Sequence, residues 1–128
     1  MPNRHNSATI EGMYTVETSD EFYEGVWKGR PLLACFHAQW CGDCHALKPA
    51  YPEIEQRFAP DVDFVQVDID DLPEIARAHE VTGIPSFILF SSGREVFRLV
   101  NPRRKTKEDV TDFLEKGLAL LPRSKEFT

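Results

Sequence analysis

The apolar run over residues 32–36 constrains the fold of this chain more than any other stretch. It lies between Pro31 and the Gln39-Trp40 corner and shows no alternation of polar and apolar residues. Such a run is typical of a strand that is buried on both faces. Strands of this kind occupy the centre of a parallel or mixed sheet whose faces are covered by helices. The run therefore predicts an α/β fold with this strand near the middle of the sheet.

The other segments alternate between extended and helical patterns. Strands are predicted over 13–16, 64–69, 86–90 and 95–100, and helices after Thr18, over 42–58, over 73–80 and after Thr106. Pro49 and Pro52 interrupt the second helical pattern, so we expect a kinked helix there. A Ser-Ser-Gly-Arg turn joins the last two strands, which predicts an antiparallel hairpin. Together these patterns predict a mixed sheet, parallel in its first part and antiparallel at its C-terminal hairpin, with helices on both faces.

Length and charge limit the class of protein. The 128 residues fit one domain, which we place at residues 13–121 between a flexible leader (1–12) and a C-terminal tail (122–128). The net charge of −6 argues against a nucleic-acid partner, and the basic cluster around Arg103, Arg104 and Lys105 is expected to be a solvated start of the last helix. No apolar run approaches the roughly 18 residues of a membrane helix, and no signal-peptide core is visible. A cytoplasmic monomer is expected.

All three cysteines lie close together, at positions 35, 41 and 44. An odd number of closely spaced thiols in a reducing compartment indicates catalysis or metal binding rather than a disulfide framework. Cys41-Gly42-Asp43-Cys44 follows the central strand and opens a helix, whose first turn favours an anion such as a thiolate. We therefore expect Cys41 to attack a target disulfide and Cys44, one turn deeper, to resolve the mixed disulfide.

Three spaced motifs resemble the thioredoxin family over residues 13–121. They are Trp40-Cys41-Gly42-Asp43-Cys44 after an apolar strand, Pro49 within the next helix, and Gly83-Ile84-Pro85 before a later strand. The resemblance implies the thioredoxin fold and a thiol–disulfide oxidoreductase that reduces protein or small disulfides.

The resemblance also implies roles for the residues around the dithiol. Cys41 and Cys44 become nucleophile and resolver, and Pro85 is expected to be cis, so that the backbone of Ile84 pairs with an extended substrate. Trp40 is expected to supply an exposed contact surface for a partner. Recycling by a flavin-containing, NADPH-dependent reductase is implied. Because the chain has no GxGxxG signature, we expect no cofactor in the chain itself.

Two positions depart from the usual pattern of the family. Asp43 stands where common thioredoxins have proline, and its carboxylate repels a neighbouring thiolate, which predicts a more reducing couple or a narrowed substrate range. Cys35 stands where the family usually has a buried aspartate for proton transfer, and we interpret it as an inert core residue. As a substitute base we hypothesise a pair formed by His37 and Asp70.

Three alternatives stay open at this stage. Cys41 to His45 also satisfies CxxCH, the attachment sequence of c-type haem. A zinc site from Cys41, Cys44 and two of His37, His45 and His5 lacks a second close ligand pair, so no metal is expected. A binding or chaperone module would keep the fold and use the Trp40 surface without turnover, and only activity distinguishes it from an enzyme.

Overall fold

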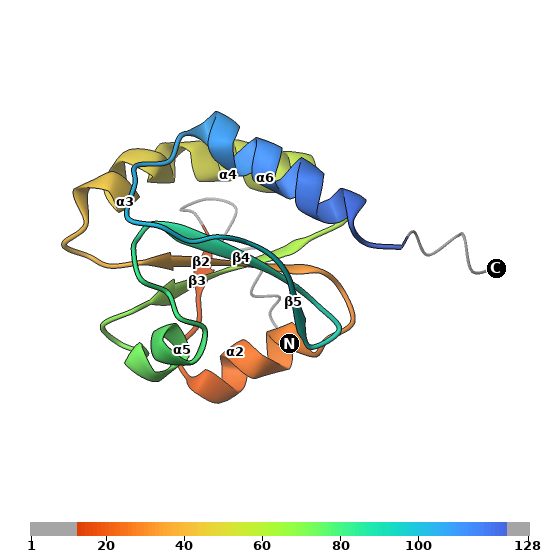
Figure 1. Ribbon diagram of the computed structural model, residues 1–128, viewed down its shortest axis with the longest axis horizontal. Helices are drawn as coiled ribbons and strands as arrows, with labels where there is room; N and C mark the ends of the chain where they lie inside the picture. Colours follow the sequence, from red (N-terminus) through yellow and green to blue (C-terminus); the bar gives the residue numbers. More distant parts are fainter. Residues whose placement is uncertain (1–12, 123–128) are drawn as a thin grey trace.

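The computed structural model describes residues 13–122 as three layers, with a twisted sheet between two layers of helices (Figure 1). The predicted leader and all of the predicted tail except Pro122 lie outside the described residues. The strands are β1 (Tyr14–Thr15), β2 (Leu32–His37), β3 (Asp63–Asp68), β4 (Ser86–Ser91) and β5 (Arg94–Leu99). The helices are α2 (Ser19–Val26), α3 (Gly42–Leu47), α4 (Tyr51–Phe58), α5 (Pro73–Ala78) and α6 (Lys107–Ala119), with a 3-10 turn over Lys48–Ala50. The predicted order of elements is confirmed.

Strand β2 is the central strand of the sheet, as its apolar run predicts. The order is β1-β3-β2-β4-β5, and β2 pairs with β3 in parallel and with β4 antiparallel. All six residues of β2 are buried. The predicted hairpin of β4 and β5 is also confirmed, and its turn places Ser92 and Gly93 at φ values of 52° and 85°.

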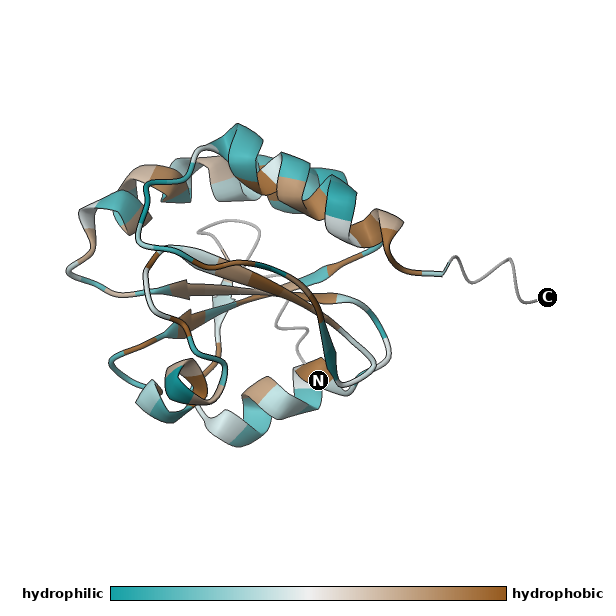
Figure 2. Cartoon of the chain, in the orientation of Figure 1, coloured by the Kyte–Doolittle hydropathy of each residue, from teal (hydrophilic) through white to brown (hydrophobic). Residues whose placement is uncertain are grey.

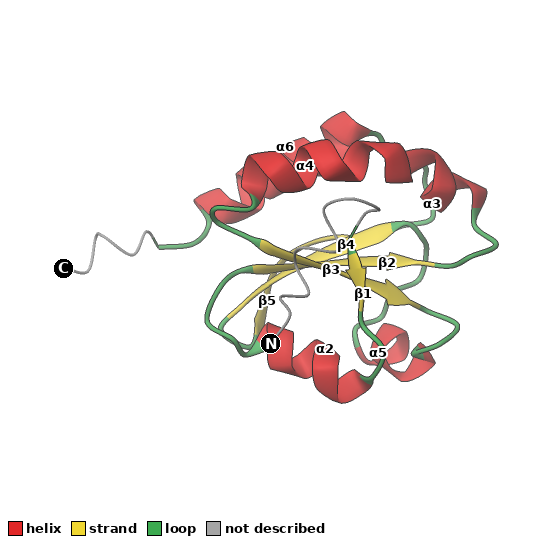
Figure 3. Cartoon of the chain, turned by 180° about the vertical axis from the view of Figure 1, so that it is seen from behind, coloured by secondary structure: helices red, strands yellow, loops and turns green. Residues whose placement is uncertain are grey.

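The helices cover both faces of the sheet. Figure 3 shows α3, α4 and α6 on one side and α2 and α5 on the other. The kink predicted between residues 42 and 58 is present, because α3 gives way to the 3-10 turn at Pro49 before α4 begins. Helix α6 begins with a complete capping box, in which the side chains of Thr106 and Asp109 each accept a backbone N–H of the other residue.

Alternation along β2 and β4 divides the core into two. Leu33, Cys35, Phe87 and Leu89 pack with α4 and α6. The intervening residues of the same strands, with Phe22 of α2, form the core on the opposite face. In Figure 2 the central strands, which lie between the two layers of helices, are mostly brown. The two cores fix β2 from both faces and so hold the loop that follows it.

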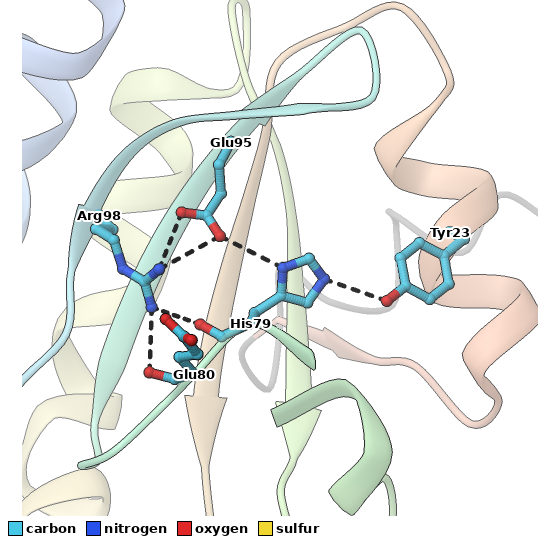
Figure 4. A network of polar contacts seen from close by, with 5 residues as sticks. All are labelled: Tyr23, His79, Glu80, Glu95 and Arg98. Atoms are coloured by element: carbon cyan, nitrogen blue, oxygen red, sulfur yellow. Dashed lines mark hydrogen bonds and ion pairs between the residues drawn. The ribbon is translucent and has the colours of Figure 1, made fainter. Parts of the chain in front are cut away.

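A polar network ties the sheet edge to the layer of α2 and α5 (Figure 4). Glu95 of β5 lies 3.1 Å from Arg98 Nη1 and 3.4 Å from His79 Nδ1. The other ring nitrogen of His79 is 3.2 Å from the Tyr23 hydroxyl. Arg98 also donates to the carbonyls of His79 and Glu80, just after α5, where Glu80 has a positive φ of 54°. Segments far apart in the sequence are thereby joined.

Candidate dithiol site

The site begins where β2 ends and the chain turns into α3. The Cys41 N–H donates to the carbonyl of Ala38 at 3.2 Å, which closes the turn. Cys41 is then the N-cap of α3, and its sulfur accepts the N–H of Cys44 at 3.2 Å. A backbone N–H at a helix start stabilises a negative charge on the sulfur that accepts it. The local geometry therefore gives the two thiols different surroundings.

Both sulfur-bearing residues are buried in a small cluster with Ala38. Cys41 is 6% exposed and Cys44 is 3% exposed, and Ile84 packs against them. The Ile84–Pro85 peptide bond is cis, as expected, and Cys41 Sγ lies 4.0 Å from the carbonyl oxygen of Ile84. The two segments that carry the site are thus brought together, although more than 40 residues separate them in the sequence.

Cys44 is held as a thiol at neutral pH. Burial raises the pKa of Cys44 to about 12, and its hydrogen bond to Cys41 acts in the same direction. Burial favours the uncharged thiol because the thiolate loses its hydration. Cys44 must therefore lose its proton to an acceptor before it can act as a nucleophile.

The hypothesised pair of His37 and Asp70 is not formed in the part of the chain that the structure describes. Asp70 lies beyond the end of β3, and its Oδ2 accepts the indole N–H of Trp40 at 2.8 Å. His37 instead lies opposite Asp68 in the parallel register of β2 and β3. The two-residue alternation correctly places His37 inside the sheet but does not determine how far along the neighbouring strand its partner lies.

His37 is buried without a hydrogen-bond partner for one ring nitrogen. Its exposed fraction is 5%, and among the described residues nothing bonds to Nε2. Burial lowers the pKa of His37, and the nearby Asp68 opposes that shift. The imidazole is therefore kept neutral near pH 7.

Trp40 presents a large exposed surface next to Cys41. The side chain is 68% exposed while its N–H is fixed by Asp70. Gly42 is also exposed, and Asp43 is half-buried. An exposed aromatic ring therefore lies next to the dithiol motif.

Two residues that the sequence did not single out, Tyr51 and Glu55, lie close to the cysteines. Burial raises the pKa of Tyr51, and charges on the cysteines act in the same direction, which places the phenol among them. Burial also raises the pKa of Glu55, whose Oε1 has no partner among the described residues. Both side chains belong to the buried side of α4, one turn apart. That spacing was visible, but a glutamate gives no signal of burial by its type.

Lys105 corrects the expectation of a solvated basic cluster. It is 4% exposed, and its Nζ donates to the carbonyl of Asn101 at 2.6 Å. Burial lowers the pKa of Lys105, whereas charges at Cys44 and Asp43 act to raise it. The buried Lys105 ammonium therefore interacts electrostatically with Cys44 and Asp43.

Residues 13–122 contain neither a side-chain cluster suited to a metal ion nor a helix that could cross a membrane. No group of three or more His, Cys, Asp or Glu side chains in that part of the chain is arranged to hold a metal ion. His5, one of the candidate zinc ligands, lies outside it. None of its helices is long and apolar enough to cross a bilayer.

Comparison with known proteins identifies the family. A family model described as thioredoxin matches residues 13–116. The chain is 40% identical over 105 residues to a thioredoxin of Mycobacterium tuberculosis, which covers 82% of this chain and 87% of that protein. It is 35% identical over 98 residues to an H-type thioredoxin of Fagopyrum esculentum, covering 76% and 84% of the two chains.

Solved structures agree. The oxidised form of mitochondrial thioredoxin 3 from Saccharomyces cerevisiae has a TM-score of 0.70 at 28% identity, and the match covers 93% of this chain and all of that one. Thioredoxin from Trypanosoma brucei brucei has the same fold, with a TM-score of 0.76 at 24% identity, covering 93% and 97%. Fold and paired thiols together define a dithiol protein of the thioredoxin fold. The chain belongs to the thioredoxin family and is a thiol–disulfide oxidoreductase with disulfide reductase activity.

Proposed function

We propose that Cys41 is the nucleophile of this reductase and that Cys44 resolves the intermediate. The observation that carries the proposal is the hydrogen bond from the Cys44 N–H to Cys41 Sγ, together with the raised pKa of the Cys44 thiol. A sulfur that accepts a backbone N–H at a helix start is the better thiolate, and a buried thiol is the poorer one.

The exchange then proceeds in two balanced steps. The Cys41 thiolate attacks one sulfur of the substrate disulfide, the substrate S–S bond breaks, and the departing sulfur takes a proton. Cys44 then loses its proton and attacks Cys41 Sγ, the mixed disulfide breaks, and the released substrate sulfur takes up a proton to become the second thiol. The substrate gains two electrons, and Cys41 and Cys44 become a disulfide.

The residues around the sulfurs position the substrate. The Ile84 carbonyl, beside the cis bond to Pro85 and 4.0 Å from Cys41 Sγ, pairs with an extended substrate segment. The exposed Trp40 ring adds contact area, and Gly42 leaves room because no heavy atom lies within 4 Å of an added Cβ. In our proposal the protein acts as a cytoplasmic monomer, and a flavin-containing, NADPH-dependent reductase restores the dithiol.

Trapping of the intermediate tests the two roles. The Cys44→Ser variant is expected to accumulate a mixed disulfide with a disulfide-containing protein substrate, whereas Cys41→Ser is expected to form none. Non-reducing electrophoresis and mass spectrometry measure the adduct. Cys35→Ser is the matched control and keeps turnover, since Cys35 is 1% exposed. An adduct formed through Cys44 in the Cys41→Ser variant would reverse the assignment.

A further inference from the structure

A groove of about 400 Å³ lies between the C-terminal half of β5, the loop over residues 100–106 and the first turns of α6. Phe97, Leu99 and Phe113 supply its apolar lining, and the rings of Phe97 and Phe113 stack with centroids 5.0 Å apart. Arg103, Arg104 and Lys105 line it as well, and we call it the basic groove. An apolar lining beside several cations is suited to a segment that carries both carboxylates and an apolar side chain.

The carboxylates that line the basic groove are already engaged. Asp109 accepts the backbone N–H of Thr106 at 2.9 Å, and Asp112 pairs with Lys116 at 3.0 Å. Within residues 13–122, neither Arg103 nor Arg104 is paired with a carboxylate, and both are exposed. Their guanidinium groups are therefore available to carboxylates from outside, which they bind in a bidentate manner.

The basic groove shares a wall with the dithiol site. The backbone of Asn101 and Pro102 packs on Gly83 so closely that an added Cβ would lie 2.5 Å from it. Gly83 directly precedes Ile84, whose carbonyl lies 4.0 Å from Cys41 Sγ. On the other side of the loop, Lys105 donates to the Asn101 carbonyl at 2.6 Å. A polypeptide bound at the sulfurs can therefore extend over this loop into the basic groove.

The charge of the whole chain makes this location selective. With a net charge of −6, the protein repels acidic polypeptides over most of its surface, whereas the basic groove attracts them. Asp43 disfavours a carboxylate directly at the sulfurs. The complementary partner thus carries its acidic residues a few positions away from its cystine.

We propose that the basic groove docks an acidic segment of the protein substrate, close in sequence to the disulfide that Cys41 attacks. This inference rests on the proposed function and names the substrate class for the same site. Arg103 and Arg104 bind carboxylates of the segment, and an apolar side chain of the segment covers the half-buried Phe97 and Leu99.

Single-turnover reduction of two matched peptides tests the proposal. Each peptide contains one disulfide, and the acidic peptide has glutamates where the basic peptide has lysines, a few positions from the cystine. The fully reduced, full-length protein is expected to reduce the acidic peptide at least ~10-fold faster at low ionic strength. The preference should shrink in about 0.5 M salt, where exposed charges are screened.

Two double variants separate the groove from net charge. Arg103→Glu with Arg104→Glu is expected to reverse the preference, whereas Arg77→Glu with Arg94→Glu changes the net charge equally, lies outside the groove and should keep it. Equal rates for both peptides with the wild-type protein, or equal losses in both double variants, overturn the inference. Reduction of neutral 2-hydroxyethyl disulfide by the wild-type protein is measured alongside. If that reaction also fails, the proposed function itself is wrong.

Discussion

The Asp43 carboxylate lies between the two cysteines in the sequence. Its negative charge disfavours a thiolate on Cys41, whereas the start of the helix favours one. A carboxylate a few ångströms from a thiolate raises its energy by about 1–4 kcal/mol at an effective dielectric constant near 20, and by less where water screens it. A less stable thiolate makes the dithiol the better reductant. The half-buried position of Asp43 keeps part of this effect.

We predict that Asp43→Asn raises the reduction potential of the Cys41–Cys44 couple by about 10–30 mV, since about 30 mV corresponds to 1.4 kcal/mol for two electrons. Equilibration against glutathione buffers measures the potential. The wild-type couple is expected at or below the roughly −270 mV typical of thioredoxin. Asp61→Asn, an exposed change in the loop after α4, should leave the potential unaltered, and a lower potential for Asp43→Asn would contradict the argument.

His37 makes the stability of the fold depend on pH. Burial lowers the pKa of His37 below its usual value of 6.5, so the unfolded chain binds a proton there that the folded chain does not. Stability is therefore full above pH 6.5 and is lost as the pH falls below it. We predict that His37→Leu loses less free energy of unfolding between pH 7 and about pH 5 than the wild type does. Urea unfolding at both pH values measures this.

The control for that prediction is His45→Leu, because His45 is exposed and its Nε2 donates to the Gln39 carbonyl at 2.6 Å. This variant makes the same histidine-to-leucine change at an exposed position and so controls for the substitution itself. A variant at position 37 that loses as much stability in acid as the wild-type protein would show that the buried imidazole does not control this transition.

At the scale of elements, the loop over 100–106 and the cis-proline segment are packed as one unit. Gly83→Ala would place a Cβ 2.5 Å from the backbone of Pro102, so the loop must move away from Ile84. We predict a loss of at least about tenfold in kcat/KM for a protein disulfide, because small misplacements of a positioned segment cost that much or more. Gly25→Ala is the control, since its nearest contact is an ordinary 3.5 Å to Leu32 and alanine suits a helix. Unchanged turnover in Gly83→Ala would contradict this coupling.

The helices and strands themselves follow from clear local sequence patterns. The apolar run of β2, the turn between β4 and β5 and the capping box at Thr106 each predict the observed structure, because each depends on neighbouring residues. The dithiol motif was likewise visible in the sequence, and the resemblance to the thioredoxin family implied the cis bond before Pro85 that the structure has.

The expectations that the structure corrects depend on contacts between segments that are distant in the sequence. The partner of Asp70 is decided by where β3 ends, and the burial of Lys105 by how the loop folds back on Gly83. Neither is set by periodicity, since the same residues on a solvated loop would show the same local pattern. Tyr51 and Glu55 were missed for the same reason.

For the whole molecule, Arg98 links the edge strand to the helix layer beneath it. Its guanidinium joins Glu95 to the carbonyls of His79 and Glu80 (Figure 4). We predict that Arg98→Met lowers the free energy of unfolding by about 1–2 kcal/mol, a range reduced for partial exposure of the pairs. Arg94→Met on the same strand is exposed and should change it by less than about 0.5 kcal/mol. Equal urea midpoints for the two variants would contradict this role.

Cys35 lies 1% exposed between β3 and β4, with its sulfur 3.2 Å from that of Met13. Burial, together with the charge of Glu55, holds its pKa far above the usual value, so it does not react while the sheet is closed. In a variant whose other two cysteines are serine, the rate of Cys35 labelling by a thiol reagent would count how often the centre of the sheet opens. Cys35 is thus a built-in probe of native-state opening, and it lies in the strand that the sequence most clearly marks as central.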